Sequence, residues 1–132
     1  MNDRVVDASA LVLAMAASGH SADTLRDRLQ GWRLSAPHLI DAEVGSVLRR
    51  QERAGLMSPA RAAATLRATH DLAMRRYPHF GWLAESAWAL RANVTFYDAL
   101  YVALAAVLRV PLVTADARLA NAPRLPCAIE LA

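Results

Sequence analysis

Short apolar segments alternate with longer helix-favouring segments along this chain of 132 residues, and this alternation constrains the fold more than any other feature. Strands that alternate with helices predict a three-layer α/β domain built on a mainly parallel sheet. The expected strands are 5–6, 32–36, 80–82, 111–115 and 127–131. The expected helices are 8–17, 21–29 with Ser21 as its cap, 37–55, 58–76, a short helix that runs to Arg91, 96–109 and the turn 116–121.

Length and composition predict one compact domain over 1–132. Hydrophobic residues make up 55% of the chain and charged residues 20%, which is enough apolar material for a core and argues against disorder. The longest apolar run, 99–108, is too short to cross a bilayer, so no membrane contact is expected. The only cysteine, Cys127, has no partner for an internal disulfide, and the cytoplasm is the expected location.

All fifteen basic side chains are arginine and none is lysine, giving a formal net charge of +3. The planar fork of arginine suits phosphate oxygens, so a polyanionic substrate is one interpretation, and a genome that prefers arginine codons is another. Arg50 returns to the side of its helix that carries Glu43. Arg49 and Arg50 are therefore candidate substrate contacts, with a solvated helix face as the alternative.

Four acidic residues stand where an ionised carboxylate is costly unless a positive charge compensates it. Asp7 and Asp116 follow strand-like runs, whereas Glu43 and Asp98 lie in apolar helical stretches. Each residue also has a structural explanation. Asp98 stands three residues after Thr95, the spacing of a capping box, and Asp116 has the place of a helix cap. Glu43 fits a solvated helix position, and Asp7 fits a turn.

If the four carboxylates lie close together, they form a candidate cation site instead of four separate caps or surface groups. Asp7 and Asp116 reach the same edge of the sheet if their strands are neighbours, because ligands of such sheets collect beyond the carboxyl ends of the strands. Two carboxylates about 4 Å apart repel by roughly 4 kcal/mol at an effective dielectric of about 20. Four in one cleft therefore call for protonation or a divalent cation, and an all-oxygen donor set favours Mg²⁺ or Mn²⁺. Such ions support hydrolysis of phosphodiesters.

Four segments resemble the PIN-domain ribonucleases, and within them the VapC-type toxins of toxin–antitoxin pairs. They are VVDASAL, APHLIDAEVGSVLRR, NVTFYDALYVALA and PLVTADARL, and they span nearly the whole chain. The resemblance implies a sheet of order 3-2-1-4-5 and a Mg²⁺- or Mn²⁺-dependent endoribonuclease. It implies that the catalytic and metal-binding set is Asp7, Glu43, Asp98 and Asp116, with Ser9 and Thr114 as supporting hydroxyls.

The same resemblance implies an RNA substrate, with tRNA or another structured RNA as a candidate, a homodimer, and a small antitoxin whose tail blocks the cleft. Asp41 competes with Glu43 for a place in the acidic set, but the two cannot share a helix face, and the surrounding AEVGSVLRR favours Glu43.

Two other functions remain as alternatives. A non-catalytic RNA- or protein-binding module would use an acidic cleft only to dock a basic peptide. A phosphoacceptor signalling domain also carries aspartates at strand ends, but it needs a lysine near the phosphoryl group, and this chain has none.

Overall fold

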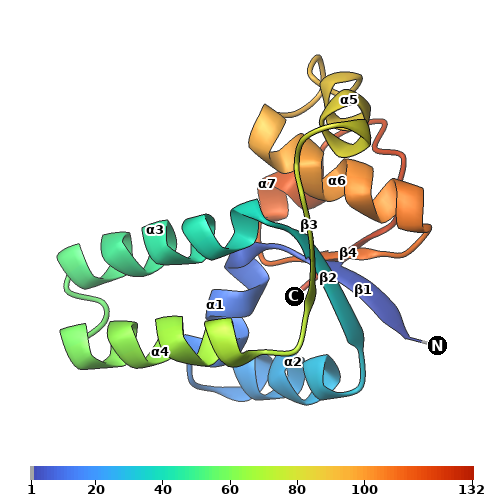
Figure 1. Cartoon of the computed structure of the whole chain (residues 1–132). Coiled ribbons are helices and arrows are strands. Elements are labelled where there is room, and N and C mark those ends of the chain that lie inside the picture. Colours follow the sequence, from blue (N-terminus) through green and yellow to red (C-terminus); the bar gives the residue numbers. More distant parts are fainter. Residues whose placement is uncertain (1) are drawn as a thin grey trace.

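A five-stranded parallel sheet forms the centre of the molecule (Figure 1). The computed structural model describes residues 2–132. The strands run in the order β3-β2-β1-β4-β5, and every neighbouring pair is parallel. The elements are β1 (Asp3–Val6), α1 (Ala8–Ala16), α2 (His20–Gln30), β2 (Arg33–Pro37), α3 (Leu39–Arg53), α4 (Pro59–Asp71), β3 (Arg75–Tyr77), α5 (Trp82–Trp88), α6 (Phe96–Leu108), β4 (Leu112–Thr114), α7 (Ala117–Ala120) and β5 (Ile129–Leu131). The three-layer fold and the strand order 3-2-1-4-5 are thereby confirmed.

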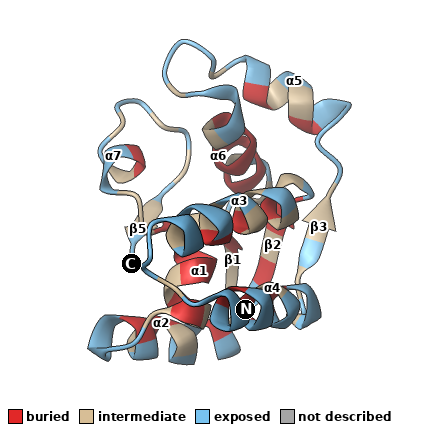
Figure 2. Ribbon diagram, turned by 90° about the vertical axis from the view of Figure 1, so that its left-hand side faces the viewer, coloured by how far each residue is buried: buried red, intermediate tan, exposed pale blue. Residues whose placement is uncertain are grey.

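Helices cover both faces of the sheet (Figure 1). On one face α1 packs against β4 and is surrounded by α2, α3 and α4; on the other, α6 packs against β1, β2 and β4 and carries α5 on its outer side. Figure 2 shows that buried residues concentrate on α1, α6 and the central strands, while α4 is largely exposed and α5 has buried, intermediate and exposed residues. Both faces of the sheet are covered, so its central strands need apolar side chains on both sides. Val5 and Val6 of β1 are accordingly fully buried.

The chain reverses its direction of travel across the sheet between β1 and β4. From β1 it proceeds to β2 and β3 on one side, and it later returns to β4 and β5 on the other. The carboxyl ends of β1 and β4 therefore flank the switch point, where ligands bind in open parallel sheets. Asp7 follows β1 directly, its backbone N–H donates to the carbonyl of Val113 at 3.2 Å, and Thr114 is the last residue of β4.

The prediction for the third strand was wrong. The strand lies at Arg75–Tyr77, inside the segment expected to end a helix, and 80–82 forms the turn before α5 and its first residue. The preceding helix stops at Asp71, and Leu72 continues in extended conformation. Helix-favouring alanine and arginine fill this region, so the sequence showed no break. An edge strand, which needs a partner on one side only, tolerates such charged side chains.

Three helix boundaries also differ from the prediction. The second helix begins at His20 after Gly19, whose φ of 108° suits glycine, and not after a Ser21 cap. Pro37 ends β2 instead of opening α3, and α5 ends at Trp88 rather than Arg91. Within residues 2–132 no helix is both long and apolar enough to span a bilayer.

Candidate active site

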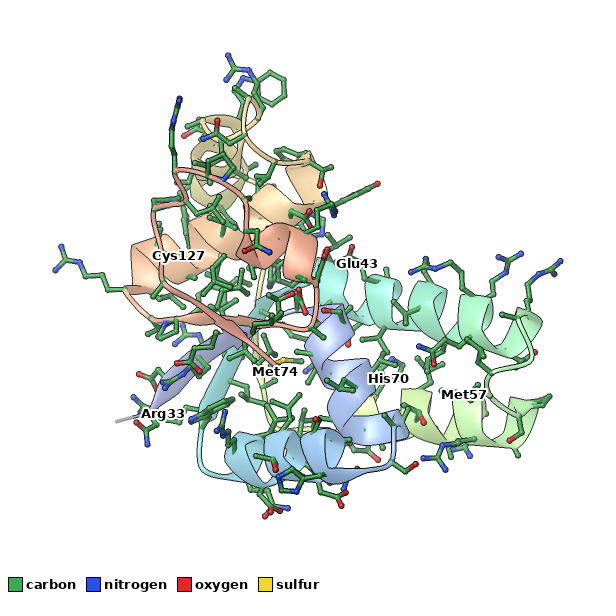
Figure 3. The ribbon with its side chains drawn as sticks, turned by 180° about the vertical axis from the view of Figure 1, so that it is seen from behind. Arg33, Glu43, Met57, His70, Met74 and Cys127 are labelled. Carbon is green, nitrogen blue, oxygen red and sulfur yellow. The ribbon has the colours of Figure 1, made fainter. Side chains whose placement is uncertain are left out.

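All four acidic residues predicted from the sequence line one cleft of about 540 Å³ at the carboxyl edge of the sheet. Asp7 enters from the β1–α1 junction, and Asp116 from the end of β4. The helices supply Glu43 and Asp98, and Figure 3 shows Glu43 near the start of α3. Of the two candidate arginines, Arg50 lines the cleft. Arg49 is exposed and is not one of the cleft's lining residues within 2–132.

Asp7 is the most deeply placed of the four carboxylates. It caps α1, where its Oδ1 accepts the backbone N–H of Ala10 at 3.0 Å. The residue is 8% exposed, and burial is the main cause that raises its carboxyl pKa above the usual range. Hydrogen bonds from Ser9, Thr114 and Ala10 lower that pKa, and the negative charge of Asp98 raises it further. The structural explanation for Asp7 as a local acceptor is therefore correct, and it is compatible with a place in the cleft.

Ser9 and Thr114 fix the position of the Asp7 carboxylate. The Ser9 hydroxyl donates to Oδ1 at 2.6 Å, and the Thr114 hydroxyl donates to Oδ2. Each hydroxyl oxygen also accepts a backbone N–H at 3.0 Å, from Ala115 to Ser9 and from Asp116 to Thr114. Because each hydroxyl has one proton and directs it at Asp7, the carboxylate is held from both sides. The pair also joins α1 to the end of β4.

Tyr101 holds Glu43, a role for which the sequence did not single this residue out. The phenol is 2% exposed and donates its O–H to Glu43 Oε1 at 2.6 Å. Burial raises the pKa of Glu43, the Tyr101 hydrogen bond lowers it, and the charges of Asp98 and Asp7 raise it. Tyr101 follows Asp98 by three residues on α6, so both face the same side of the helix. That spacing relates Tyr101 to Asp98, but it does not identify Glu43 as the partner of the phenol.

Asp41 is directed away from the cleft, as the choice of Glu43 required. Its carboxylate makes a two-pronged ion pair with the guanidinium of Arg76, at 2.7 Å from Nε to Oδ2 and 3.0 Å from Nη2 to Oδ1. This contact ties α3 to the edge strand β3. Asp41 therefore has a structural partner of its own.

We expect Tyr101→Phe to raise the pKa of the Glu43 carboxyl further. The Tyr101 hydroxyl donates to the ionised carboxylate and favours it, so its removal leaves burial and the neighbouring negative charges to dominate. Phenylalanine keeps the ring that fills this part of the core. Carboxyl ¹³C chemical shifts followed against pH measure the change, and a Glu43 pKa that is unchanged or lower in the variant contradicts the assigned role.

Asp98 and Asp116 both act at helix starts while their carboxylates face the cleft. Thr95 caps α6 by accepting the backbone N–H of Asp98 at 3.2 Å, and Asp116 caps α7 by accepting the N–H groups of Arg118 and Leu119. The cap explanation is therefore correct for Asp116, whereas for Asp98 only half of the capping box forms, because within residues 2–132 no hydrogen bond joins the Thr95 N–H to the Asp98 carboxylate. The Arg118 guanidinium reaches both carboxylates through Nη2, at 3.4 Å from Asp98 Oδ2 and 3.2 Å from Asp116 Oδ2.

The donor chemistry of the cleft fits a hard divalent cation. Within residues 2–132 the side chains that line the cleft supply carboxylate and hydroxyl oxygens and include no histidine or cysteine, and the Asp7 and Glu43 pKa values are raised partly by neighbouring negative charge that a cation would neutralise. In the same part of the chain no three His, Cys, Asp or Glu side chains are grouped closely enough to hold a metal ion by themselves. An open site still suits Mg²⁺, which keeps several waters and is usually bound through one or two carboxylates.

Comparisons with known proteins show the family of this chain. The family model described as the PIN domain matches residues 4–125. The chain is 54% identical to Ribonuclease VapC1 of Mycobacterium tuberculosis over 131 residues, covering 99% of this chain and 98% of that protein. It is 42% identical to Ribonuclease VapC9 of the same organism over 127 residues, covering 96% of each chain.

Solved structures share the fold. The structure of PAE2754 from Pyrobaculum aerophilum superposes with a TM-score of 0.67 at 28% identity, over 90% of this chain and 83% of that one. VapBC2 from Rickettsia felis, solved with a DNA fragment of its promoter, has a TM-score of 0.70 at 12% identity over 98% of both chains. The full-length match to the family model and the identity to whole relatives lead to one conclusion: the chain belongs to the PIN-domain family, in its VapC branch.

Proposed function

We propose that this protein is a Mg²⁺- or Mn²⁺-dependent endoribonuclease that acts as the toxin of a VapBC-type toxin–antitoxin pair. The observation that carries the proposal is the convergence of Asp7, Glu43, Asp98 and Asp116 on one cleft. Relatives that match almost the full chain at 54% and 42% identity are named ribonucleases. A net charge of +3 around an acidic centre suits a polyanionic substrate.

Some residues of the cleft would hold the cation, and others position the carboxylates that hold it. Asp7, Glu43, Asp98 and Asp116 would hold Mg²⁺ or Mn²⁺, which supplies an activated water and neutralises charge on the phosphodiester when bound. Ser9 and Thr114 keep Asp7 from rotating, because both hydroxyls donate to it. Tyr101 keeps Glu43 directed into the cleft. Arg50 lines the same cleft, in reach of a substrate phosphate.

The test is cleavage of structured RNA by the purified protein, with tRNA included among the substrates. We expect cleavage with Mg²⁺ or Mn²⁺, loss of cleavage with excess chelator, and recovery when the metal is restored. Activity that persists unchanged in chelator would disprove the metal-dependent mechanism. A protein that binds RNA or a basic peptide tightly but cleaves nothing under any metal condition would instead be the non-catalytic binding module.

The partners follow from the same proposal. A small antitoxin with a basic tail suits an acidic cleft that already accepts a guanidinium, that of Arg118.

Homodimer formation agrees with exposed aromatic residues on and before α5, where Phe80 is 76%, Trp82 48% and Trp88 58% exposed. Light scattering of the purified chain distinguishes a dimer from a monomer by mass. A cytoplasmic location agrees with a role on cellular RNA.

A further inference from the structure

One guanidinium stands between two carboxylates of the cleft. The Nη2 atom of Arg118 lies 3.4 Å from Asp98 Oδ2 and 3.2 Å from Asp116 Oδ2, so a single donor nitrogen spans both side chains. These carboxylates belong to different elements, Asp98 to the first turn of α6 and Asp116 to the start of α7. A positive group that joins two acids in this way compensates part of the negative charge that a divalent ion would otherwise compensate.

We propose that Arg118 is an internal counter-ion that occupies the cation position between Asp98 and Asp116, and that a divalent ion binds these carboxylates by displacing it. The inference rests on the proposed metal-dependent function. On this proposal Arg118 competes with the metal ion for the two carboxylates, and this competition lowers the affinity of the RNA-free protein for the ion.

The arrangement of Arg118 makes it displaceable. Its side chain is 71% exposed, while those of Asp98 and Asp116 are 22% and 35% exposed. Within residues 2–132 its guanidinium makes hydrogen bonds only to these two carboxylates. An ion pair with so exposed a cation is weak and flexible, so the side chain leaves the carboxylates at small cost. Arg118 also belongs to α7, a helix of four residues, and moving its side chain disturbs no buried packing.

The other arginine of the cleft does not share this role. Arg50 lines the cleft from α3, but no ion pair links it to an acidic side chain in the described part of the protein. Arg50 therefore adds a general positive field, whereas Arg118 competes for the carboxylate oxygens themselves. This difference lets the contribution of one arginine be separated from that of the overall charge.

The experiment is isothermal titration of the full-length protein with Mn²⁺ at fixed pH and ionic strength, without RNA. Arg118→Gln removes the competing charge and is expected to bind Mn²⁺ about tenfold more tightly than the wild type, a difference of about 1.4 kcal/mol. Arg118→Lys keeps a positive charge at the same place and is expected to stay within about threefold of the wild type. Arg67→Gln, on the exposed face of α4, removes a charge far from the cleft and is expected to leave Mn²⁺ affinity unchanged.

The possible outcomes separate this inference from the function on which it rests. Equal or weaker Mn²⁺ binding by Arg118→Gln overturns the role of Arg118, whereas metal-dependent RNA cleavage by the wild type would still support the proposed function. An equally large gain of Mn²⁺ affinity in Arg67→Gln also overturns the role of Arg118, because the change in net charge alone would then explain the result. Absence of Mn²⁺ binding in every variant overturns both. If Arg118→Gln does not fold, Arg118→Ala in the same titration carries the same expectation.

Discussion

Asp98→Asn is expected to lower the rate of Mg²⁺-dependent RNA cleavage by roughly 10²- to 10⁴-fold, the range found for a positioned catalytic group. Asparagine has almost the same shape but no charge, so the cleft loses one anionic ligand without a change in packing. The side chain is 22% exposed and shares the cleft with three other carboxylates. Removing one negative charge relieves repulsion, so the free energy of unfolding should stay equal or rise.

Cleavage of a labelled RNA under single-turnover conditions measures the change, and thermal unfolding confirms that the variant is folded. Asp27→Asn, which removes an exposed carboxylate on α2 away from the cleft, is the matched control and should cleave at the wild-type rate. If Asp98→Asn and Asp27→Asn both retain full activity, Asp98 has no part in the chemistry, and the assignment of the acidic set fails.

Leu104→Ala is expected to lower the free energy of unfolding by about 2 to 5 kcal/mol. Leu104 is fully buried in α6, the helix that covers one whole face of the sheet through its contacts with β1, β2 and β4. Truncation removes buried methyl groups and leaves a cavity in the middle of that layer. A loss of this size is a large share of the stability of a typical domain. Urea denaturation followed by circular dichroism measures it.

Val107→Ala on the same helix is the control, because Val107 is 51% exposed and buries little surface. We expect its free energy of unfolding to change by less than about 0.5 kcal/mol. Alanine is a better helix former than leucine or valine, so equal losses in the two variants could not arise from helix propensity and would mean that burial of Leu104 is not what sets the loss. A small loss in Leu104→Ala would show that the core around α6 closes over the cavity.

Local patterns in the sequence were strong enough to predict most of the secondary structure. The segment 99–108 has almost no polar side chain, so a buried helix was predicted there from composition alone, and α6 is observed at this place, buried through Ala105 with Val107 exposed. The segments 5–6 and 111–115 were correctly assigned as strands. Prediction failed for β3, because its residues Arg75–Tyr77 have no strand pattern of their own. Pairing with β2 decides their conformation, and pairing is a long-range interaction.

The candidate site, like the fold, could be predicted from the sequence only in part. Acid residue type and placement after strands are enough to single out Asp7 and Asp116 from the sequence. No local pattern gave the hydrogen bond from Tyr101 to Glu43, which joins residues 58 positions apart, or the contact of Arg118 with Asp98 across 20 positions. Such contacts depend on how α3, α6 and α7 approach one another, and that approach is fixed by packing against the sheet.

The apolar periodicity of the chain allows few ways to bury a core other than an α/β fold, and the surroundings of four acidic residues mark the carboxylates that are costly to leave uncompensated. The shared cleft of these four carboxylates, and the guanidinium that lies between two of them, follow only from the packing of the folded chain. The physical reason is the sheet order: parallel pairing of β4 beside β1 brings residues more than a hundred positions apart to the same edge, and electrostatic interactions act over distance in space, not along the chain.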